Sequence, residues 1–505
     1  MTHTRDDAPT VALDRSAPTP HAGALEWCAR RFVWLAAAVL ALAAFNLTFR
    51  LGHEFLTEWD ESLYAVTAAE VLDRGHWIGT TFLGALDYYN TKPPLNVWLI
   101  ALAFKVFGKS LIALRLASAA SAWLTVAVLM SWSRRVFGPA VALLTGLVLA
   151  TSFGFVHIHA GRSANTDALF TFIMSLTAIT LWAEYTQPWR RAWLGPLLAG
   201  AFLLRGMAVL MPLLLVAGVW GLARPRRPRA WMPTLVAGAL FVVPVGAWMA
   251  ARFEVDRWAF LSRLFFYDFV ARSTDVIEGH PGSLLYYPNI LQKHHFDWLC
   301  AGAAALVLAP IPWTRVRRGV SAWRSQPAAI LLTAWAGATL VPPTLMLTKL
   351  PWYLNTFYPV FAVLIALLIV GAVARLARAP WSWRQRALAG AVVVAFGVAE
   401  SKLVWYSYAY RDLDLTDQGL VLAAADQLAG HRLFRAQDDR AGMFVASQLA
   451  GAQPSVATTP EIFLRDSRAG DYLIATTALA NPNLEFVDTT GRFWLYRNCS
   501  PPLQR

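Results

Sequence analysis

Long apolar segments alternate along this chain with short loops rich in arginine. The first apolar segment covers residues 32–49, and Arg30 and Arg31 stand immediately before it. Several segments reach the roughly 20 residues that a helix needs to cross a bilayer. Because cytoplasmic loops carry the excess of positive charge, the N-terminus is expected in the cytoplasm. The pattern predicts an α-helical polytopic membrane protein with about eleven membrane segments.

The same alternation assigns each later segment a direction, with arginine clusters on the inner side. The predicted spans after the first are 111–132, 139–156, 166–185, 194–222, 231–250, 298–313, 327–347, 353–373 and 387–405. Segment 95–107 is apolar but short, which is typical of an interfacial or re-entrant helix. Arg205-Gly206 interrupts 194–222 and predicts two shorter helices that meet at a watery surface.

Composition changes at both ends of the chain. Residues 1–29 are polar without an apolar period and predict a disordered cytoplasmic tail. Residues 30–405 form the predicted transmembrane domain, with outer loops 51–110 and 251–296. From residue 406 to 505 acids return, which predicts a small periplasmic α/β domain. Its expected elements are a helix over 416–428 and strands over 471–476, 484–487 and 492–497.

Composition also limits the function classes. The chain has 505 residues, of which 57% are hydrophobic and 15% charged, with a formal net charge of +13. The positive-inside rule accounts for this charge, so no nucleic-acid partner is expected. Three distant cysteines indicate no disulfide framework. The absence of a P-loop and of an HExxH motif from the sequence leaves ATP hydrolysis and gluzincin proteolysis without support.

Residues 58–98 form the longest early polar interval, between two predicted membrane segments. It opens with the acids Asp60 and Glu61 at the start of a predicted helix that ends at Gly75. Tyr64 lies one helical turn after Asp60, so the two side chains share a face of this helix. It closes on Lys92-Pro93-Pro94, where proline fixes the direction of the backbone. Taken alone, a first-turn acid is favoured by the helix dipole and a boundary lysine by headgroups. An acid pair and a lysine framing one aqueous loop favour a functional site.

Further ionisable groups fall on the predicted outer side. They are Arg162, Asp167, Arg205, Arg272, His280 and Lys349. Charged groups at one end of a helix bundle indicate a charged substrate between membrane and water. Asp167 has an alternative reading as a helix N-terminal acid paired with Arg162. Carboxylates beside cations suit transfer of a sugar from a lipid phosphate, because a carboxylate can deprotonate the nucleophile while cations hold the leaving phosphate.

The motifs of the chain resemble those of the membrane-embedded GT-C glycosyltransferases that use polyprenyl-phosphate sugars. This family includes the bacterial aminoarabinose transferase to lipid A and the protein O-mannosyltransferases. The matching motifs are Asp60-Glu61 with Tyr64, Gly75-His76-Trp77, Lys92-Pro93-Pro94-Leu95 with Trp98, Gly108 and Arg115, Asp167, and Lys349-Leu350-Pro351 with Tyr353. The resemblance implies an inverting transferase with a polyprenyl-phosphate-linked donor and an active site on the outer face.

We therefore expect a catalytic group and a donor-binding group of residues. The expected catalytic residues are Asp60, Glu61, Lys92 and Asp167. The expected contacts to the donor and its phosphate are Tyr64, Arg205, Arg272, His280, Lys349 and Tyr353. Asp60 and Asp167 could hold a divalent metal ion, and no other cofactor is expected.

Two features of the sequence leave alternatives open. Arg205-Gly206-Met207 stands where the family often has Lys-Gly-Pro, and an arginine fork differs from a lysine point charge. The C-terminal domain carries no motif of the family. The acceptor is expected to be lipid A, another envelope lipid or a glycan; a protein acceptor and a transporter of lipid-linked sugar are the alternatives.

Overall fold

The computed structural model describes most of the chain. The described residues are 23–56, 59–222, 231–271, 274–276, 279–312, 314–315, 317, 319, 323, 326–376, 382–436 and 440–500. The chain forms two compact units. Unit 1 comprises Met1–Thr48, Thr91–Pro93 and Ser118–Leu403. Unit 2 comprises Phe49–Asn90, Pro94–Ala117 and Val404–Arg505.

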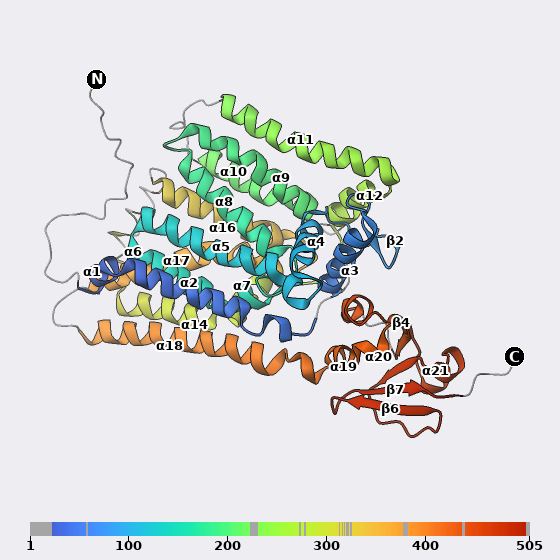
Figure 1. Ribbon diagram of the computed structural model, residues 1–505. Helices are drawn as coiled ribbons and strands as arrows, with labels where there is room; N and C mark the ends of the chain where they lie inside the picture. Colours follow the sequence, from blue (N-terminus) through green and yellow to red (C-terminus); the bar gives the residue numbers. More distant parts are fainter. Residues whose placement is uncertain are drawn as a thin grey trace. The chain divides into compact units, whose positions relative to one another are not determined.

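Unit 1 is a bundle of apolar helices (Figure 1). Its α-helices are α1 (Gly23–Arg30), α2 (Phe32–Thr48), most of α5 (Leu111–Phe137), α6 (Pro139–Ala150), α7 (Phe153–His157), α8 (Asp167–Ala183), α9 (Leu194–Arg205), α10 (Leu210–Leu222), α11 (Trp231–Asp256), α12 (Ala259–Ser262), α14 (Tyr286–Leu308), α16 (Pro327–Leu345), α17 (Tyr358–Leu376) and α18 (Trp383–Trp405). Shorter helical turns are η2 (Pro188–Trp193), η3 (Gly206–Val209), η4 (Arg263–Ala271) and η6 (Pro351–Leu354). Helix α6 packs against both α2 and α17, and α9 packs against α8 and α11.

Among the described residues, seven helices are long and apolar enough to cross a membrane. They are Phe32–His53, Leu111–Phe137, Pro188–Leu222, Trp231–Asp256, Pro327–Leu345, Tyr358–Leu376 and Trp383–Tyr410. Three shorter apolar helices accompany them, and Leu95–Phe107 is one of these, as the sequence predicts. The chain is therefore a multi-pass membrane protein, as expected, although these helices do not reproduce the count of about eleven segments.

Three predicted segments differ in detail from the structure. Helix α1 occupies the end of the tail that was expected to be disordered up to residue 29. The predicted span 139–156 is two helices: α6 ends at Ala150 with Thr151 as its C-cap, and Ser152 caps α7 by accepting a hydrogen bond from the Phe155 N–H. The predicted outer loop 251–296 is largely helical, and it includes the start of α14, which is kinked at His295.

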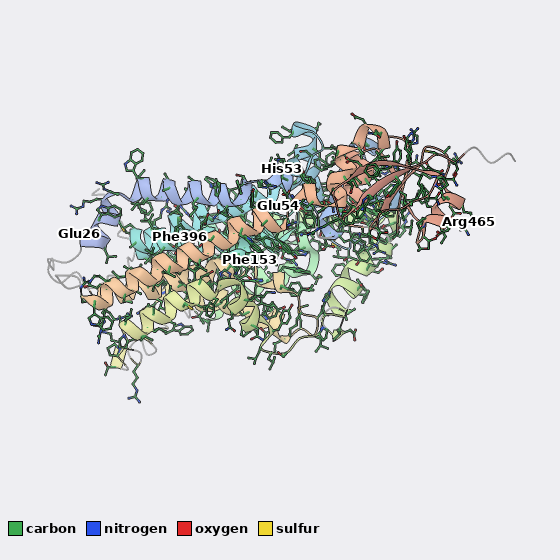
Figure 2. All side chains as sticks on the ribbon, turned by 90° about the horizontal axis from the view of Figure 1, so that it is seen from below. Glu26, His53, Glu54, Phe153, Phe396 and Arg465 are labelled. Atoms are coloured by element: carbon green, nitrogen blue, oxygen red, sulfur yellow. The ribbon has the colours of Figure 1, made fainter. Side chains whose placement is uncertain are left out.

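A polar side chain of the bundle contacts groups on two other helices. The ammonium of Lys402, on α18, lies 4.7 Å from the ring centroid of Phe153, which Figure 2 labels on α7. The same lysine donates a hydrogen bond to the Lys293 carbonyl. A cation over an aromatic face is stabilised by the ring quadrupole. Lys402 on α18 therefore contacts α7 through an aromatic ring and α14 through a backbone carbonyl.

The predicted interruption at Arg205-Gly206 is present. Helix α9 ends at Arg205, one short turn follows, and α10 begins at Leu210. Gly206 has φ 54° and ψ −121°, a backbone conformation that is essentially restricted to glycine. A Cβ atom at this position would lie 2.5 Å from Cδ1 of Leu264. Backbone geometry and packing therefore both require glycine at the break.

Unit 2 contains the early polar interval and the C-terminal segment. The first part holds η1 (Leu51–His53), α3 (Trp59–Arg74), the hairpin of β1 (Thr81–Phe82) and β2 (Ala85–Leu86), α4 (Leu95–Phe107) and the start of α5. The C-terminal part holds η7 (Tyr406–Tyr410), η8 (Leu413–Leu415), α19 (Asp417–Ala423), α20 (Ala425–Leu428), β3 (Arg432–Arg435), η9 (Val445–Leu449), β4 (Gln453–Val456), α21 (Pro460–Asp466), β5 (Tyr472–Ala475), β6 (Leu484–Thr489) and β7 (Trp494–Asn498).

The five C-terminal strands form one mixed sheet in the order β4-β3-β5-β7-β6. Strand β3 pairs in parallel with β4 and β5, while β7 is antiparallel to β5 and β6. Phe434, Phe463 and Leu473 pack together as its core. The expected C-terminal α/β fold is confirmed, and β3, β4 and α21 are elements that the sequence analysis did not predict.

Substituting Gly206→Ala should destabilise the break between α9 and α10 by roughly 1–3 kcal/mol, because alanine disfavours this φ/ψ combination and clashes with Leu264. Thermal unfolding of the purified protein in detergent measures the effect. Gly221→Ala in α10 is the control, since a Cβ there meets no atom within 4 Å. Equal melting temperatures for the two variants would contradict the assignment.

Candidate active site

A polar cluster of unit 1 is centred on Asp167, the first residue of α8. Its carboxylate accepts a hydrogen bond from Nη1 of Arg205 at 2.5 Å, and the two side chains are 4% and 14% exposed. The Arg205 guanidinium also lies 5.5 Å from the ring centroid of Phe170. Burial makes an unpaired carboxylate costly, so this ion pair explains how Asp167 is tolerated at the start of an apolar helix.

Lys92 stands beside the same break in the helices. Lys92, Arg205 and His159 lie close enough to the Asp167 carboxylate to interact with it electrostatically. The next residue, Pro93, approaches within 3.6 Å of the Cβ position of Gly206. The proline corner predicted after Lys92 thus lies against the predicted helix break. We call Lys92, His159, Asp167 and Arg205 the Asp167 cluster.

A buried loop over residues 158–166 carries His159 into this cluster. His159 has φ 52°, and its ring stacks on Trp352 with centroids 3.7 Å apart and planes 15° from parallel. The loop is held by Arg162, whose Nη1 donates to the Asn46 carbonyl at 2.6 Å, and by Asn355, whose Nδ2 donates to the Ile158 carbonyl at 2.8 Å. Arg162 therefore anchors the loop. The sequence offered Arg162 as an ion-pair partner of Asp167, but Arg205 forms that ion pair.

Lys349 has an arrangement that the sequence analysis did not anticipate. Its ammonium donates hydrogen bonds to the carbonyls of Pro343, Thr344 and Met346 at the end of α16. These carbonyls have no partner within the helix, and cations are favoured at helix C-termini. Lys349 thus caps α16 in this structure, and its predicted contact with a phosphate stays a prediction.

The backbone around Lys349 pairs with a segment distant in sequence. The Lys349 N–H donates to the His280 carbonyl at 3.0 Å, and Pro281 and Thr348 form an antiparallel bridge. His280 is exposed, and Tyr353 lies half-buried in the following turn η6. Arg272, the other predicted phosphate contact of this region, lies outside the described residues.

In unit 2, Asp60 is the second residue of α3. Asp60 is half-buried, whereas Tyr64, one turn later, is 2% exposed. The preceding residue, Trp59, packs on Tyr89 with ring centroids 4.0 Å apart, and the guanidinium of Arg440 lies 4.4 Å from its ring centroid. The N-terminus of α3 is therefore framed by aromatic side chains, with Asp60 more accessible than its neighbours Glu61 and Tyr64.

Glu61 has a different environment from Asp60. Its Oε1 accepts a hydrogen bond from Nε of Arg115 at 2.7 Å, and both side chains are fully buried. Nη1 of Arg115 donates to the carbonyls of Leu51 and Glu54, at 2.8 Å in each case. Arg115 thus joins α3, α5 and the segment between α2 and α3. This arrangement favours a structural role for Glu61, and its predicted catalytic role stays a prediction.

The residues described here do not form an evident metal site. No group of three or more His, Cys, Asp or Glu side chains within the described ranges is placed to hold a metal ion. Asp167, one of the two predicted ligands, already binds Arg205. Since the donor set does not fit a divalent ion, we derive no chemical step through a metal.

The structure brings together Lys92, Asp167 and Arg205, which are distant in sequence and were all predicted from their charge. His159 and Trp352 are additional members of this region. The sequence showed His159 only as one of two histidines in positions i and i+2, and Trp352 only as a residue after Lys349-Leu350-Pro351. Their stacking depends on a loop conformation that has no signal in the local sequence.

A protein-family match covers the region of the Asp167 cluster. Residues 91–248 match the family of dolichyl-phosphate-mannose-protein mannosyltransferases. This segment contains every member of the Asp167 cluster.

Curated relatives are bacterial proteins named undecaprenyl phosphate-α-4-amino-4-deoxy-L-arabinose arabinosyl transferase. The protein of Pseudomonas aeruginosa strain UCBPP-PA14 is 30% identical over 349 residues, which cover 64% of this chain and 57% of that protein. The protein of Pseudomonas savastanoi pv. phaseolicola is 39% identical over 145 residues, which cover 28% and 27% of the two chains. The matches thus span about half or less of these relatives' length.

Solved structures extend the similarity to nearly the whole fold. The crystal structure of ArnT from Cupriavidus metallidurans bound to undecaprenyl phosphate has a TM-score of 0.64 and 18% identity, covering 94% of this chain and 98% of that one. An oligosaccharyltransferase from Archaeoglobus fulgidus, in complex with Zn and sulfate, has a TM-score of 0.51 and 13% identity, covering 82% and 62%. These matches confirm the GT-C fold and the resemblance that the sequence motifs predict.

The structural role of Glu61 can be tested directly. Glu61→Gln should lower the stability of unit 2 by ~3–5 kcal/mol, because it leaves the Arg115 guanidinium buried without its counter-charge. Asp73→Asn is the control, since Asp73 pairs with Lys109 at the surface and such pairs contribute ~0–1 kcal/mol. Thermal unfolding in detergent compares them. A stable but inactive Glu61→Gln protein would instead support the predicted catalytic role of Glu61.

Proposed function

We propose that this chain is an inverting membrane glycosyltransferase that moves a sugar from a polyprenyl-phosphate carrier to a lipid or glycan acceptor. The observation that supports it best is the Asp167 cluster: Lys92 and Arg205 place two cations around one carboxylate, inside the segment that matches the mannosyltransferase family. The names of the curated relatives make an undecaprenyl-phosphate-linked aminopentose the first donor to test.

The cations of the cluster suit a phosphate at the membrane boundary. A guanidinium carries five N–H donors, so Arg205 can serve the Asp167 carboxylate and a phosphate together. Lys92 adds a second positive charge next to the proline corner. As the bond between the sugar carbon and the phosphate oxygen breaks, negative charge collects on the phosphate, and fixed cations stabilise it. We assign Lys92 and Arg205 to donor binding and Asp167 to holding Arg205 in position.

We assign the acceptor side of the reaction to Asp60. A carboxylate accepts the proton of the acceptor hydroxyl while the oxygen attacks the sugar carbon. Attack in line with the leaving phosphate inverts the configuration at that carbon. Asp60 is the candidate because it is half-buried at the start of α3, whereas Glu61 is already paired with Arg115. Tyr64, His280, Lys349 and Tyr353 keep their predicted roles as contacts to the donor and its phosphate.

We further propose an inner-membrane location with the N-terminus in the cytoplasm and the C-terminal α/β part in the periplasm. The support is the charge pattern: arginines are concentrated in the loops assigned to the inside, while the acids and Lys92 fall on the opposite side. The acceptor chemistry then takes place at the periplasmic face, where envelope lipids and glycans are exposed.

A protein acceptor is the second candidate. The matching family is described as transferring mannose to protein, and this description favours a protein O-glycosyltransferase. Mass spectrometry of envelope lipids, glycans and proteins, with and without the gene, separates the two. Loss of a sugar from lipid or glycan supports the first proposal, and loss from a protein hydroxyl supports the second. An unchanged set of glycoconjugates, with altered distribution of the carrier across the membrane, would favour a transporter.

Asp60→Asn should abolish transfer while leaving expression and membrane insertion intact, because the amide keeps the shape but cannot accept the proton. Product formation from radiolabelled donor by purified protein measures this. Asp73→Asn is the matched control, since it makes the same change on the same helix at an exposed ion pair. Wild-type turnover by Asp60→Asn would remove Asp60 from the mechanism.

Arg205→Ala and Lys92→Ala should raise the donor KM by about 10-fold or more each, with the acceptor KM little changed, because each removes a charged contact worth at least ~1.5 kcal/mol. Lys92→Arg and Arg205→Lys should recover part of the loss. Steady-state kinetics, with the donor and then the acceptor concentration varied, measures the two KM values. A raised acceptor KM with normal donor binding would show that the two substrates have been assigned to the wrong sides.

A further inference from the structure

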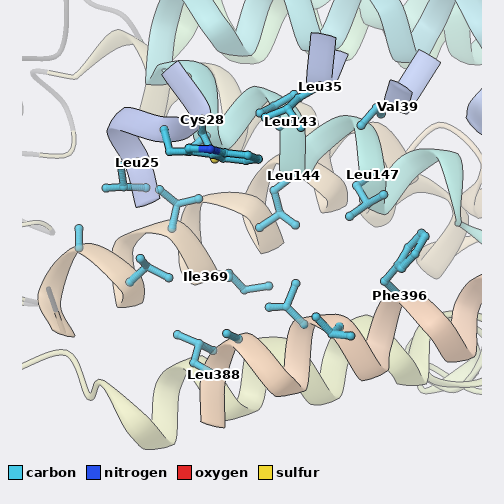
Figure 3. Close-up of a pocket in the computed structure, with 18 of the residues that line it drawn as sticks. Leu25, Cys28, Leu35, Val39, Leu143, Leu144, Leu147, Ile369, Leu388 and Phe396 are labelled. Atoms are coloured by element: carbon cyan, nitrogen blue, oxygen red, sulfur yellow. The ribbon is translucent and has the colours of Figure 1, made fainter. Parts of the chain in front are cut away.

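A large apolar cavity lies in unit 1, away from the Asp167 cluster. It has a volume of about 940 Å³ and lies among α1, α2, α6, α17 and α18 (Figure 3). Leu35, Val39, Leu144, Leu147, Ile369 and Phe396 are among its lining residues. Its volume falls within the range of ligand pockets in proteins. None of the lining residues carries a formal charge.

The cavity occupies the opposite ends of the helices from the candidate active site. Trp352, which stacks on His159, precedes the first residue of α17, whereas the cavity is lined by residues from Ile369 to the last residue of that helix, Leu376. On α18 the lining residues begin at Gln385, in the first turn. The cavity is therefore separate from the cluster that we assign to donor binding.

The cavity opens to its surroundings on one side. Trp27, on α1, and Val393, on α18, both line it and are 46% and 67% exposed. Water is a poor occupant, because the apolar walls offer it few hydrogen-bond partners. An empty cavity loses the dispersion contacts of its lining atoms. A hydrocarbon chain entering from the bilayer would supply those contacts.

Arginines lie next to the open side. Arg30 and Arg31 follow the cavity-lining residues of α1, and the Arg31 guanidinium lies 5.7 Å from the ring centroid of Trp27. Arg384 and Arg386 flank Gln385 in the first turn of α18, and both are exposed. An apolar groove with a basic rim is complementary to an anionic lipid, whose chains and phosphate require these two surroundings.

We propose that this groove binds an anionic glycerophospholipid of the inner leaflet, with its acyl chains in the cavity and its phosphate among the arginines. The lipid would join α1 to α18, which are distant in sequence. Polyprenyl phosphate is the rival occupant. We favour the phospholipid because the basic rim lies at the helix ends remote from the Asp167 cluster, where the phosphate of the carrier is proposed to bind.

Native mass spectrometry of the full-length protein in detergent tests this proposal. The probes are dioleoyl phosphatidylglycerol, dioleoyl phosphatidylcholine and undecaprenyl phosphate at equal concentration. Ala389→Trp fills the cavity from α18, and Val394→Trp places the same side chain on an exposed position of α18 that does not line it. We expect phosphatidylglycerol to be retained over phosphatidylcholine, and retention to fall in Ala389→Trp but not in Val394→Trp.

The rim is tested separately with Arg384→Gln combined with Arg386→Gln, which leaves the cavity walls unchanged. Each lost arginine should reduce the preference for phosphatidylglycerol by roughly 5-fold, with transferase activity unaffected. If size-exclusion chromatography shows that Ala389→Trp does not fold, the double arginine variant alone tests whether the groove binds an anionic lipid. Equal retention of both phospholipids, equal effects of the two tryptophan variants, or displacement of phosphatidylglycerol by undecaprenyl phosphate would each overturn the proposal.

Discussion

The ion pair between Asp167 and Arg205 is the constraint on which the polar part of unit 1 depends. An apolar helix beginning with a buried carboxylate is stable only if a cation meets it. The break after α9 delivers that cation, and Gly206 makes the break possible through a backbone conformation closed to other residues. Pro93 then packs beside the same glycine and brings Lys92 with it. One electrostatic requirement thus organises three distant segments.

Much of this arrangement could be predicted from the sequence, because hydrophobicity and charge act locally. The apolar runs predicted most helix positions within a few residues, and Arg205-Gly206 predicted the break because arginine is costly in hydrocarbon. Gly75 ends α3 with φ 74°, as expected of a glycine after the last helical turn. The membrane-domain fold and three members of the cluster, Lys92, Asp167 and Arg205, were predictable because each carries its own signal, whereas His159 was not predicted.

Which side chains pair with one another was less predictable, because pairing depends on tertiary contacts. Asp60 and Glu61 are adjacent acids with the same helical propensity, yet Glu61 is enclosed with Arg115 while Asp60 is half-buried. Asp167 was paired with Arg162 as the alternative reading, but Arg162 binds the Asn46 carbonyl instead. Strands β3 and β4 were missed because β3 (RLFR) has an arginine at each end and β4 (QPSV) contains a proline and mostly polar residues, so neither shows a strand pattern. For Glu61 and Arg162 the deciding neighbour lies far along the chain.

The contacts of Lys349 suggest why this residue would be conserved among related proteins. Pro342 and Pro343 lie near the end of α16, and the ammonium binds carbonyl oxygens left over where the helix stops. Selection for folding alone would preserve a lysine that caps a helix in this way. A descendant that had lost its sugar donor would keep Lys349 while Lys92 and Arg205 drifted. Under the proposed donor-binding role of Lys92 and Arg205, the inheritance of Lys349 would record the ancestry of the fold, whereas the joint inheritance of Lys92 and Arg205 would record the retention of donor binding.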